Sequence, residues 1–371
     1  MSHPPEWAAP AAPAKTNPDQ PYSMTDNTPL VSIALATYNG EAFLEEQLAS
    51  LHAQSYPNLE IVACDDCSRD GTVEILRKWQ ASHGLHVHLN PQNLGFVRNF
   101  EQCLRMCRGE YILLADQDDV WEPHKVATLL EKIRSSEALL VYSDAQLIDE
   151  QGEPLPCGLW ETLERQPVAQ NARTAFYLGN VVTGCTTIMR RELLEHTLPI
   201  PDGFTFHDWW LGYVAAQHER LDFLPQRLTR YRQHDGNVAG AGLKAKRSRR
   251  TWKSPLSIWN EKRRKLQKLD NFAKDHARNL QIFHRYESEH GLDNTVSAML
   301  LRWGRDYDSK YSLHDYREFF QQNPQLFATM SNPRKSMRRS LKSKIRRKLK
   351  VLMTPLIAVT VALVCAAIWL F

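Results

Sequence analysis

An α/β fold, with a mostly parallel sheet between helices, is the fold class predicted for this chain of 371 residues. Short apolar runs, which are typical of buried strands, alternate with segments whose apolar residues recur at helical spacing. The first strand-like runs also end in polar or acidic residues. Strands that alternate with helices form right-handed crossover units, so we expect the carboxyl ends of these strands to meet at one edge and form the site there.

Five strands are expected in the first 150 residues, and helices follow the first four. The strands are expected at 30–35, 59–64, 86–89, 111–115 and 139–142, and the helices at about 43–51, 72–79, around 100–104 and at 124–133. The pattern loosens from about 150 to 240, and the chain beyond Gly242 is basic and helical.

The acidic stretch Asp116-Gln117-Asp118-Asp119 follows the fourth strand. Three carboxylates at the end of a buried strand repel one another and resist desolvation, so they persist where a cation or strong donors neutralise them. Carboxylate oxygens suit Mg²⁺ or Mn²⁺, which keep water and substrate phosphates in their coordination shell. The alternative is a solvated acidic turn in which Asp119 caps the next helix.

The cysteines and the charge distribution limit the cellular compartment and the kinds of partner that are expected. Seven scattered cysteines and the lack of a signal peptide favour a reducing cytosol. The pairs Cys64/Cys67 and Cys103/Cys107 suggest either a zinc site or buried free thiols, and the spacing favours the thiols. The net charge of +4 hides two basic runs, 244–268 and 334–350. Neither run contains a nucleic-acid motif, so no nucleic-acid partner is expected.

The two ends of the chain differ from the middle. Residues 1–28 are rich in Pro and Ala and are predicted to be a disordered leader. Residues 351–371 carry no charge, and at ~1.5 Å rise per residue such a helix spans a ~30 Å hydrocarbon core. A buried core helix is the alternative. The basic run before this segment predicts a membrane anchor with the folded domain in the cytoplasm, and basic residues there attract anionic lipid.

Six motifs together resemble glycosyltransferase family 2, and within it the bacterial rhamnosyltransferase-like members that build surface polysaccharide. The resemblance covers about 30–242 and implies a GT-A fold, a nucleotide-sugar donor, a divalent cation (Mg²⁺ or Mn²⁺) and inversion at the anomeric carbon. The motifs are Ala36-Thr37-Tyr38-Asn39-Gly40, Asp65-Asp66-Cys67-Ser68-Arg69-Asp70-Gly71-Thr72, Asn93-Leu94-Gly95, Asp116-Gln117-Asp118-Asp119-Val120-Trp121, His207-Asp208-Trp209-Trp210 and Tyr231-Arg232-Gln233-His234.

The resemblance also divides the chain. It implies a catalytic domain at 29–242, with a nucleotide-sugar half at 29–150 and an acceptor half at 151–242. Residues 243–350 form a basic helical extension that either packs under this domain or docks on the membrane, and 351–371 form the anchor. The Gln-x-x-Arg-Trp motif of processive relatives is not matched by 226–231, which favours transfer of a single sugar.

The resemblance assigns the donor and metal residues. Asp118 is expected to bind the metal directly, with His234 as a further metal or diphosphate ligand and Asp116 directed at the ribose or the metal. Local alternatives remain: Asn39 as a turn residue, Asp65, Asp66 and Asn93 as caps, and His234 as a structural histidine. The expected donor-binding residues are Thr37, Tyr38, Asn39, Asp65, Asp66, Asn93, Asp116 and Gln117.

Asp208 is the expected general base, because a carboxylate in an apolar, partly closed site can take the acceptor proton. Its neighbours Trp209 and Trp210 are expected to desolvate it and to offer a face to the acceptor sugar. His207, Thr183 and Gly184 complete the expected acceptor side. The alternatives are an aspartate that caps a buried helix, core tryptophans and small residues required by packing.

The resulting expectation is an inverting transferase that moves one sugar, with L-rhamnose from dTDP-rhamnose as the best single donor and UDP-hexoses as alternatives. The expected acceptor is a polyprenyl-diphosphate-linked saccharide of O-antigen or lipopolysaccharide synthesis, with a lipid A–core acceptor as the alternative, and the expected place is the bacterial inner membrane. A nucleotidyltransferase is disfavoured because the first loop, 37–40, lacks a basic residue. A non-catalytic scaffold is disfavoured because Asp118 and Asp208 are both present.

Overall fold

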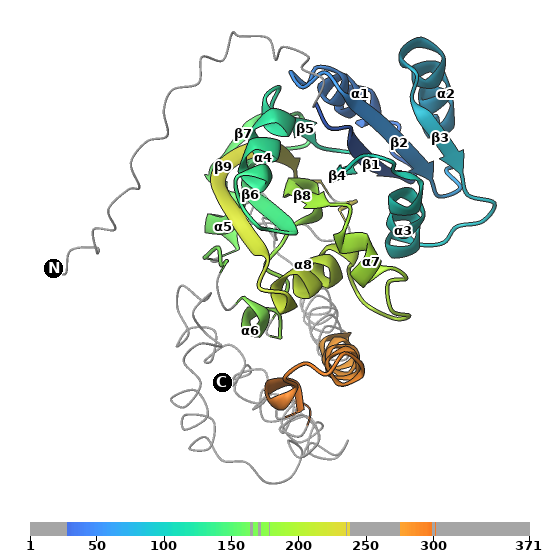
Figure 1. The fold of residues 1–371 in the computed structure, drawn as a ribbon. Helices are drawn as coiled ribbons and strands as arrows, with labels where there is room; N and C mark the ends of the chain where they lie inside the picture. The colour runs from blue at the N-terminus through green and yellow to red at the C-terminus, as the bar shows by residue number, and fades with distance from the viewer. Residues whose placement is uncertain are drawn as a thin grey trace, which may run out of the picture.

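A computed structural model describes residues 28–163, 166–169, 172–177, 179–234, 236–237, 275–298 and 301. In this part of the chain a nine-stranded sheet lies between helices (Figure 1). The strands are β1 (Val31–Thr37), β2 (Leu59–Asp65), β3 (His86–Leu89), β4 (Tyr111–Asp116), β5 (Val120–Trp121), β6 (Leu140–Ile148), β7 (Pro154–Gly158), β8 (Thr187–Arg190) and β9 (Leu221–Arg232). The helices are α1 (Leu44–His52), α2 (Thr72–His83), α3 (Phe96–Met106), α4 (Lys125–Arg134), α5 (Leu159–Thr162), α6 (Arg173–Phe176), the 3₁₀ turn η1 (Gly184–Thr186), α7 (Leu193–Thr197) and α8 (His207–Gln217).

The sheet is mixed, with the strand order β3-β2-β1-β4-β8-β6-β9-β5 and β7 beside β6. β1 is parallel to β2 and β4, and β2 is parallel to β3, which confirms the predicted crossover units of the first half. β8 is antiparallel to both β4 and β6, and β5 is antiparallel to β9. β9 is parallel to β6, so the second half combines parallel and antiparallel pairs, and the sheet is mixed where a mostly parallel one was predicted. The chain enters β8 from the short turn η1 and β5 from the acidic turn, without a crossover helix.

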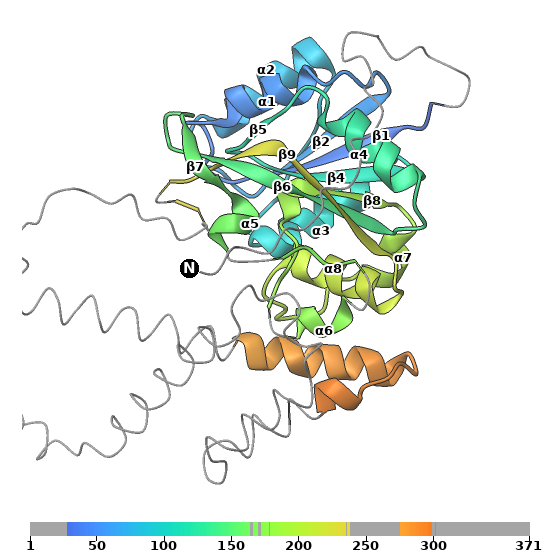
Figure 2. The same cartoon turned by 90° about the vertical axis from the view of Figure 1, so that its left-hand side faces the viewer.

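Each face of the sheet is covered by its own set of helices, because successive residues of a strand point to opposite faces. In β1, Ile33 and Leu35 pack with α1, α2 and α4, whereas Ala34 packs with α3 and α8 on the other face. Figure 2 shows α1 and α2 on one side of the sheet and α3, α6 and α8 on the other. The burial of both faces explains why the strands are nearly continuous apolar runs.

The carboxyl ends of the parallel strands lie in register, as predicted. Thr37 at the end of β1 pairs with Asp65 at the end of β2, and Ala36 pairs with Asp116 at the end of β4. The backbone ladder therefore fixes the acidic residues of two strands beside the first loop. This edge of the sheet is where the candidate site is built.

A helix at 275–289 packs behind α8 (Figure 2). Phe283 is fully buried, and its ring stacks on Tyr213 with ring centroids 3.7 Å apart. The buried Glu287 carboxylate accepts hydrogen bonds from the hydroxyls of Tyr177, Tyr213 and Ser297 and from Gln217. Of the two alternatives for the extension, residues 275–298 show packing against the catalytic domain.

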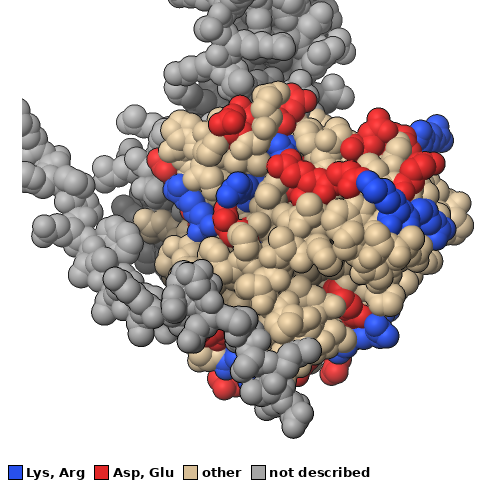
Figure 3. Space-filling model, turned by 90° about the horizontal axis from the view of Figure 1, so that it is seen from above, with Lys and Arg blue, Asp and Glu red and all other residues tan. Residues whose placement is uncertain are grey.

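The expected leader and anchor, at 1–27 and 351–371, lie outside the described residues, and so do both basic runs. Among the helices that the structure describes, none combines the length and the apolar character needed to cross a bilayer. From above, acidic and basic side chains of the described residues lie close to one another around a broad uncharged area (Figure 3).

Six cysteines are described, and all are free thiols. Cys64, Cys103 and Cys107 are buried, and the Cys103 thiol donates to the Val62 carbonyl at 3.0 Å. The Cys67 thiol donates elsewhere, to the Asn90 carbonyl at 3.1 Å. Cys64, Cys103 and Cys107 are thus buried thiols in the core, whereas Cys67 is partly exposed.

Glu287→Ala is expected to lower the free energy of unfolding by about 2–4 kcal/mol, because four donors in the core lose their acceptor. Chemical denaturation followed by tryptophan fluorescence measures the change. Glu289→Ala is the matched control, since Glu289 is exposed on the same helix, and it should change stability by less than about 0.5 kcal/mol. Equal effects of the two variants would show that the Glu287 contacts contribute nothing.

Candidate active site

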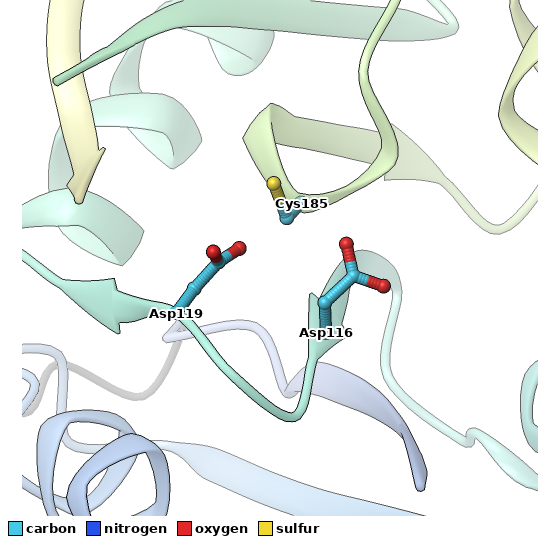
Figure 4. Close-up of side chains that lie close together, drawn as sticks. All are labelled: Asp116, Asp119 and Cys185. Carbon is cyan, nitrogen blue, oxygen red and sulfur yellow. The ribbon is translucent and has the colours of Figure 1, made fainter. Parts of the chain in front are cut away.

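The acidic turn between β4 and β5 directs two of its carboxylates inward. The ligand atoms of Asp116, Asp119 and Cys185 all lie within 4.8 Å of one another (Figure 4). Asp119 is only 1% exposed, and its Oδ1 accepts the backbone N–H of Arg232 at 3.1 Å. Its Oδ2 has no hydrogen-bond partner among the described residues. The N-terminus of α4 receives no side-chain cap, so the interpretation of Asp119 as a helix cap is wrong.

Asp118 points to a different neighbour. Its Oδ2 lies 2.7 Å from Nε2 of His234, at the end of β9, and accepts from Asn237 at 3.4 Å. The Asp118 and His234 side chains are 13% and 15% exposed. The structure therefore brings together the two residues expected to bind the metal, from positions far apart in the sequence.

Burial and mutual repulsion raise the pKa values of two carboxyl groups in this turn. Burial, together with the negative charges of Asp118 and Asp208, raises the pKa of Asp116 to about 7. Burial also raises the pKa of Asp119 well above its usual value, with Asp118 and Asp116 adding to the shift. A divalent cation fits this surplus of negative charge, because hard carboxylate oxygens converge and one buried oxygen of Asp119 lacks a partner.

A buried lysine, which sequence reasoning missed, lies under the turn. Lys125 is fully buried at the start of α4. Its Nζ donates to the Cys185 carbonyl at 2.6 Å and to Thr229 Oγ1 at 2.9 Å, and it lies 3.4 Å from the centroid of the Trp121 ring. Burial lowers the pKa of Lys125 to about 7, against the opposing charges of Cys185, Asp119 and Asp116. The signal was the spacing: Lys125 lies four residues before the buried Leu129 on the same helix face.

A second buried cation, Arg232, holds the turn from the other side. It is 1% exposed, and its guanidinium donates to Glu46 Oε2 at 2.6 Å, to the Asp118 carbonyl at 2.8 Å and to the Glu150 carbonyl at 3.1 Å. Together with its backbone bond to Asp119, these contacts connect α1, the acidic turn and the β6–β7 connection. Arg232 lies in the motif 231–234, but no role was predicted for it.

The two aspartates after β2 orient the neighbouring loops. Asp65 is 1% exposed and accepts from Thr37 Oγ1 at 2.9 Å and from the Ser68 N–H at 2.9 Å. Asp66 is 2% exposed and accepts the N–H groups of Leu94 and Gly95 at 2.7 and 2.9 Å. Both carboxylates are at the expected edge. Their contacts in this structure are loop contacts, and a role in donor binding stays a prediction.

The rim of the site carries the more accessible donor-side candidates. Gln117 brackets the backbone of Tyr38, accepting its N–H at 2.7 Å and donating to its carbonyl at 3.0 Å, and the Tyr38 ring is 47% exposed. Asn39 has φ +48° and accepts the Arg69 N–H at 2.8 Å, which matches the turn interpretation. The exposed Asn93 donates to the Asp66 carbonyl at 2.9 Å.

Asp208 lies in the first turn of α8, and its carboxylate is held by two residues of the segment that leads into β8. It accepts the Gly184 N–H and the Asn180 side-chain amide, each at 2.9 Å. Thr183 precedes Gly184, and its carbonyl accepts from Thr186 at 2.9 Å. Cys185, which follows Gly184, has its Sγ within 4.8 Å of the Asp116 and Asp119 oxygens, so the turn η1 places Asp208 beside the acidic turn.

The two tryptophans after Asp208 belong to the core. Trp209 and Trp210 are 3% and 2% exposed, and their indole N–H groups donate to the carbonyls of Phe176 and Thr197. They offer no face to a sugar, which corrects the prediction that they bind the acceptor. The apolar residues of α8 on all sides explain this burial.

His207 is also buried, at 6% exposure, with its ring stacked on Phe100 at a centroid distance of 3.9 Å. Neither ring nitrogen has a hydrogen-bond partner among the described residues. Burial lowers the pKa of His207 to about 3. The ring lies inside the core, which corrects its assignment to the acceptor side.

Arg232→Met is expected to lower the free energy of unfolding by about 2–4 kcal/mol, because the carbonyls of Asp118 and Glu150 and the carboxylate of Glu46 lose the buried guanidinium that donates to them. The matched control is Arg230→Met, two residues earlier in β9. Arg230 is 49% exposed and forms an ion pair with Glu122, so its loss should cost about 0–1 kcal/mol. Denaturant unfolding curves of both variants at one pH measure the two losses. Equal losses would show that Arg232 contributes no more to stability than a surface charge does.

The buried neutral His207 is expected to make stability fall in acid. The unfolded state binds a proton below pH 6.5 and the folded state only near pH 3, so stability is full above 6.5 and declines as the pH falls from 6.5 towards 3. The slope is about 1.4 kcal/mol per pH unit at most. Unfolding of His207→Phe at pH 7, 6 and 5 should lack this component. His124→Gln, which alters an exposed histidine, should keep it.

Comparison with known proteins identifies the class. Residues 32–198 match the model of glycosyl transferase family 2. The putative teichuronic acid biosynthesis glycosyltransferase TuaG of Bacillus subtilis (strain 168) is 26% identical over 232 residues, which span 62% of this chain and 88% of that protein. The dTDP-rhamnosyl transferase RfbG of Shigella flexneri is 26% identical over 227 residues, 57% of this chain and 75% of that protein.

The crystal structure of S. aureus TarS 1-349 in complex with UDP-GlcNAc is similar in fold, with a TM-score of 0.53 over 80% of each chain at 17% identity. This likeness concerns the fold alone, and it agrees with a GT-A-like arrangement of a mixed sheet flanked by helices. Residues 32–198 are therefore a glycosyl transferase family 2 domain, and the chain is a glycosyltransferase.

Proposed function

We propose that the chain is an inverting, metal-dependent glycosyltransferase that moves one sugar from a nucleotide diphosphate donor to a saccharide acceptor of bacterial surface polysaccharide. The observation that carries the proposal is the arrangement of two acidic groups at one sheet edge. The Asp116–Asp119 turn supplies the carboxylates for the expected metal and donor, and Asp208 is bound by Gly184, the neighbour of Cys185, whose Sγ lies within 4.8 Å of the Asp116 and Asp119 oxygens. Donor chemistry and acceptor chemistry are thus supplied from opposite halves of the sheet.

A divalent cation bound by Asp118 and His234, with Asp116 beside them, would stabilise the negative charge that develops on the departing diphosphate. The protein's own residues do the rest. Asp208 takes the proton of the acceptor hydroxyl as that oxygen forms its bond to the anomeric carbon, and the bond from this carbon to the diphosphate oxygen breaks. The N–H of Gly184 and the amide of Asn180 hold the Asp208 carboxylate in place for this step.

We also propose the identity of the donor and of the acceptor. dTDP-rhamnose remains the best single donor, and the relative named as a dTDP-rhamnosyl transferase supports it. UDP-sugars are the alternative, supported by the similar fold solved with UDP-GlcNAc. The uncharged segment 351–371 and the basic run before it support an acceptor linked to a polyprenyl diphosphate, at the inner membrane with the site facing the cytoplasm.

Donor turnover by the full chain in detergent, with a polyprenyl-linked acceptor extract, tests the proposal. The panel is dTDP-rhamnose, UDP-glucose, UDP-galactose and UDP-N-acetylglucosamine, each with Mn²⁺, Mg²⁺ or EDTA. We expect one donor to be used and EDTA to abolish transfer. Asp208→Asn should lower kcat by about 10²–10⁴-fold, since it removes the general base.

Asp202→Asn is the control, because Asp202 is a fully exposed acid in the loop before α8. It should leave turnover unchanged. Transfer that persists in EDTA would contradict the metal, and transfer that persists in Asp208→Asn would contradict the base. Retention of the anomeric configuration in the product would contradict direct inversion.

A further inference from the structure

Lys125 connects two parts of the site that the proposed mechanism treats separately. Its amine is bound by two oxygen acceptors, the carbonyl of Cys185 and the hydroxyl of Thr229. The Thr229 hydroxyl donates in turn to the same Cys185 carbonyl, at 3.1 Å. One carbonyl of the turn η1 is therefore fixed by two donors from α4 and β9.

The same turn holds the base. Gly184, the neighbour of Cys185, donates its N–H to Asp208 Oδ2 at 2.9 Å. The Gly184 carbonyl is itself held by the Thr187 hydroxyl at 2.8 Å. A displacement of the Cys185 carbonyl would move the Gly184 peptide, and the Asp208 carboxylate with it, because the bonded atoms follow one another directly along η1.

Lys125 also faces the metal side of the site. The Cys185 carbonyl that binds its amine belongs to the residue whose Sγ lies within 4.8 Å of the carboxylate oxygens of Asp116 and Asp119. Trp121 covers the amine from below, at 3.4 Å from the ring centroid. The protonated Lys125 amine lowers the net negative charge that the acidic turn presents, so it opposes the binding of a second cation there.

We propose that Lys125 is a positioning residue that fixes η1 and, through η1, the carboxylate of Asp208. Its positive charge also lowers the affinity of the acidic turn for the divalent cation. The inference rests on the proposed function, since it assigns Asp208 and the metal their roles. The competing interpretation is a lysine that serves stability alone. The two differ in the direction in which metal affinity changes when the charge is removed.

Lys125→Met is the first test, because methionine keeps an unbranched side chain against Trp121 and removes the amine. We expect kcat to fall by about 10²-fold, as a displaced base loses its alignment with the acceptor. We expect Mn²⁺ to bind about 10-fold more tightly to the donor-free protein, measured by electron paramagnetic resonance, because one positive charge is lost near the carboxylates. A lysine needed for stability alone would weaken both functions and lower Tm.

Thr229→Val is the second variant, and it covers the case in which Lys125→Met does not fold. It removes one bond to the Cys185 carbonyl and leaves the charge in place. We expect kcat to fall about 10-fold with Mn²⁺ affinity unchanged. Lys132→Met is the control, since Lys132 lies on the same helix and pairs with Asp222 at the surface, and both readouts should stay at the wild-type level.

A double-mutant cycle with Asp208→Asn tests the route of the effect. If Lys125 acts through Asp208, Lys125→Met should lower the residual rate of Asp208→Asn by less than about 3-fold, whereas independent effects would multiply. Multiplying effects, or weaker Mn²⁺ binding in Lys125→Met, overturn the inference. An inactive wild-type chain would count against the proposed function alone, because the Mn²⁺ titrations still decide whether Lys125 lowers the affinity of the acidic turn for the divalent cation.

Discussion

The structure depends on the neutralisation of buried acidic groups at one edge of the sheet. Parallel strands bring their carboxyl ends together, so the same ladder that orders the core forces Asp65 and Asp116 to lie near each other. Desolvated charges of one sign are tolerated only with partners. Arg232, on the last strand along the chain, donates its backbone N–H to the Asp119 carboxylate and its guanidinium to the Asp118 carbonyl, and it forms an ion pair with Glu46. The site is therefore complete only when the two halves of the sheet have joined.

As a result, the three aspartates of the acidic turn have different roles. Asp119 is internal and receives the backbone of Arg232, so it anchors the turn. Asp118 is more accessible and faces His234, so it remains available to a ligand. Asp116 lies between them, close to Asp208 and Lys125. Neighbouring residues of one sequence motif thus serve different purposes, because the turn directs alternate carboxylates inward and outward.

The first half of the fold and most of the site edge could be predicted from sequence, because periodicity and polar strand ends are local signals. The antiparallel entry of β8 was not predictable in this way, since it depends on pairing with β4 and β6. Trp209 and Trp210 were misassigned although α8 is apolar on all sides, a pattern that indicates a buried helix. Lys125 and Arg232 were missed because a charged residue is expected at the surface unless its partners are known.

The extent of the catalytic unit follows from α8. This helix carries Asp208 at its start, and an apolar helix must be covered on every side. The sheet and α3 cover part of it, and Phe283 and Tyr286 of the helix at 275–289 cover another part. The predicted boundary at 242 therefore separates residues that share one core. Residues up to at least 298 help to hold the base in place, so the extension contributes to the geometry of the site as well as to any attachment of the chain.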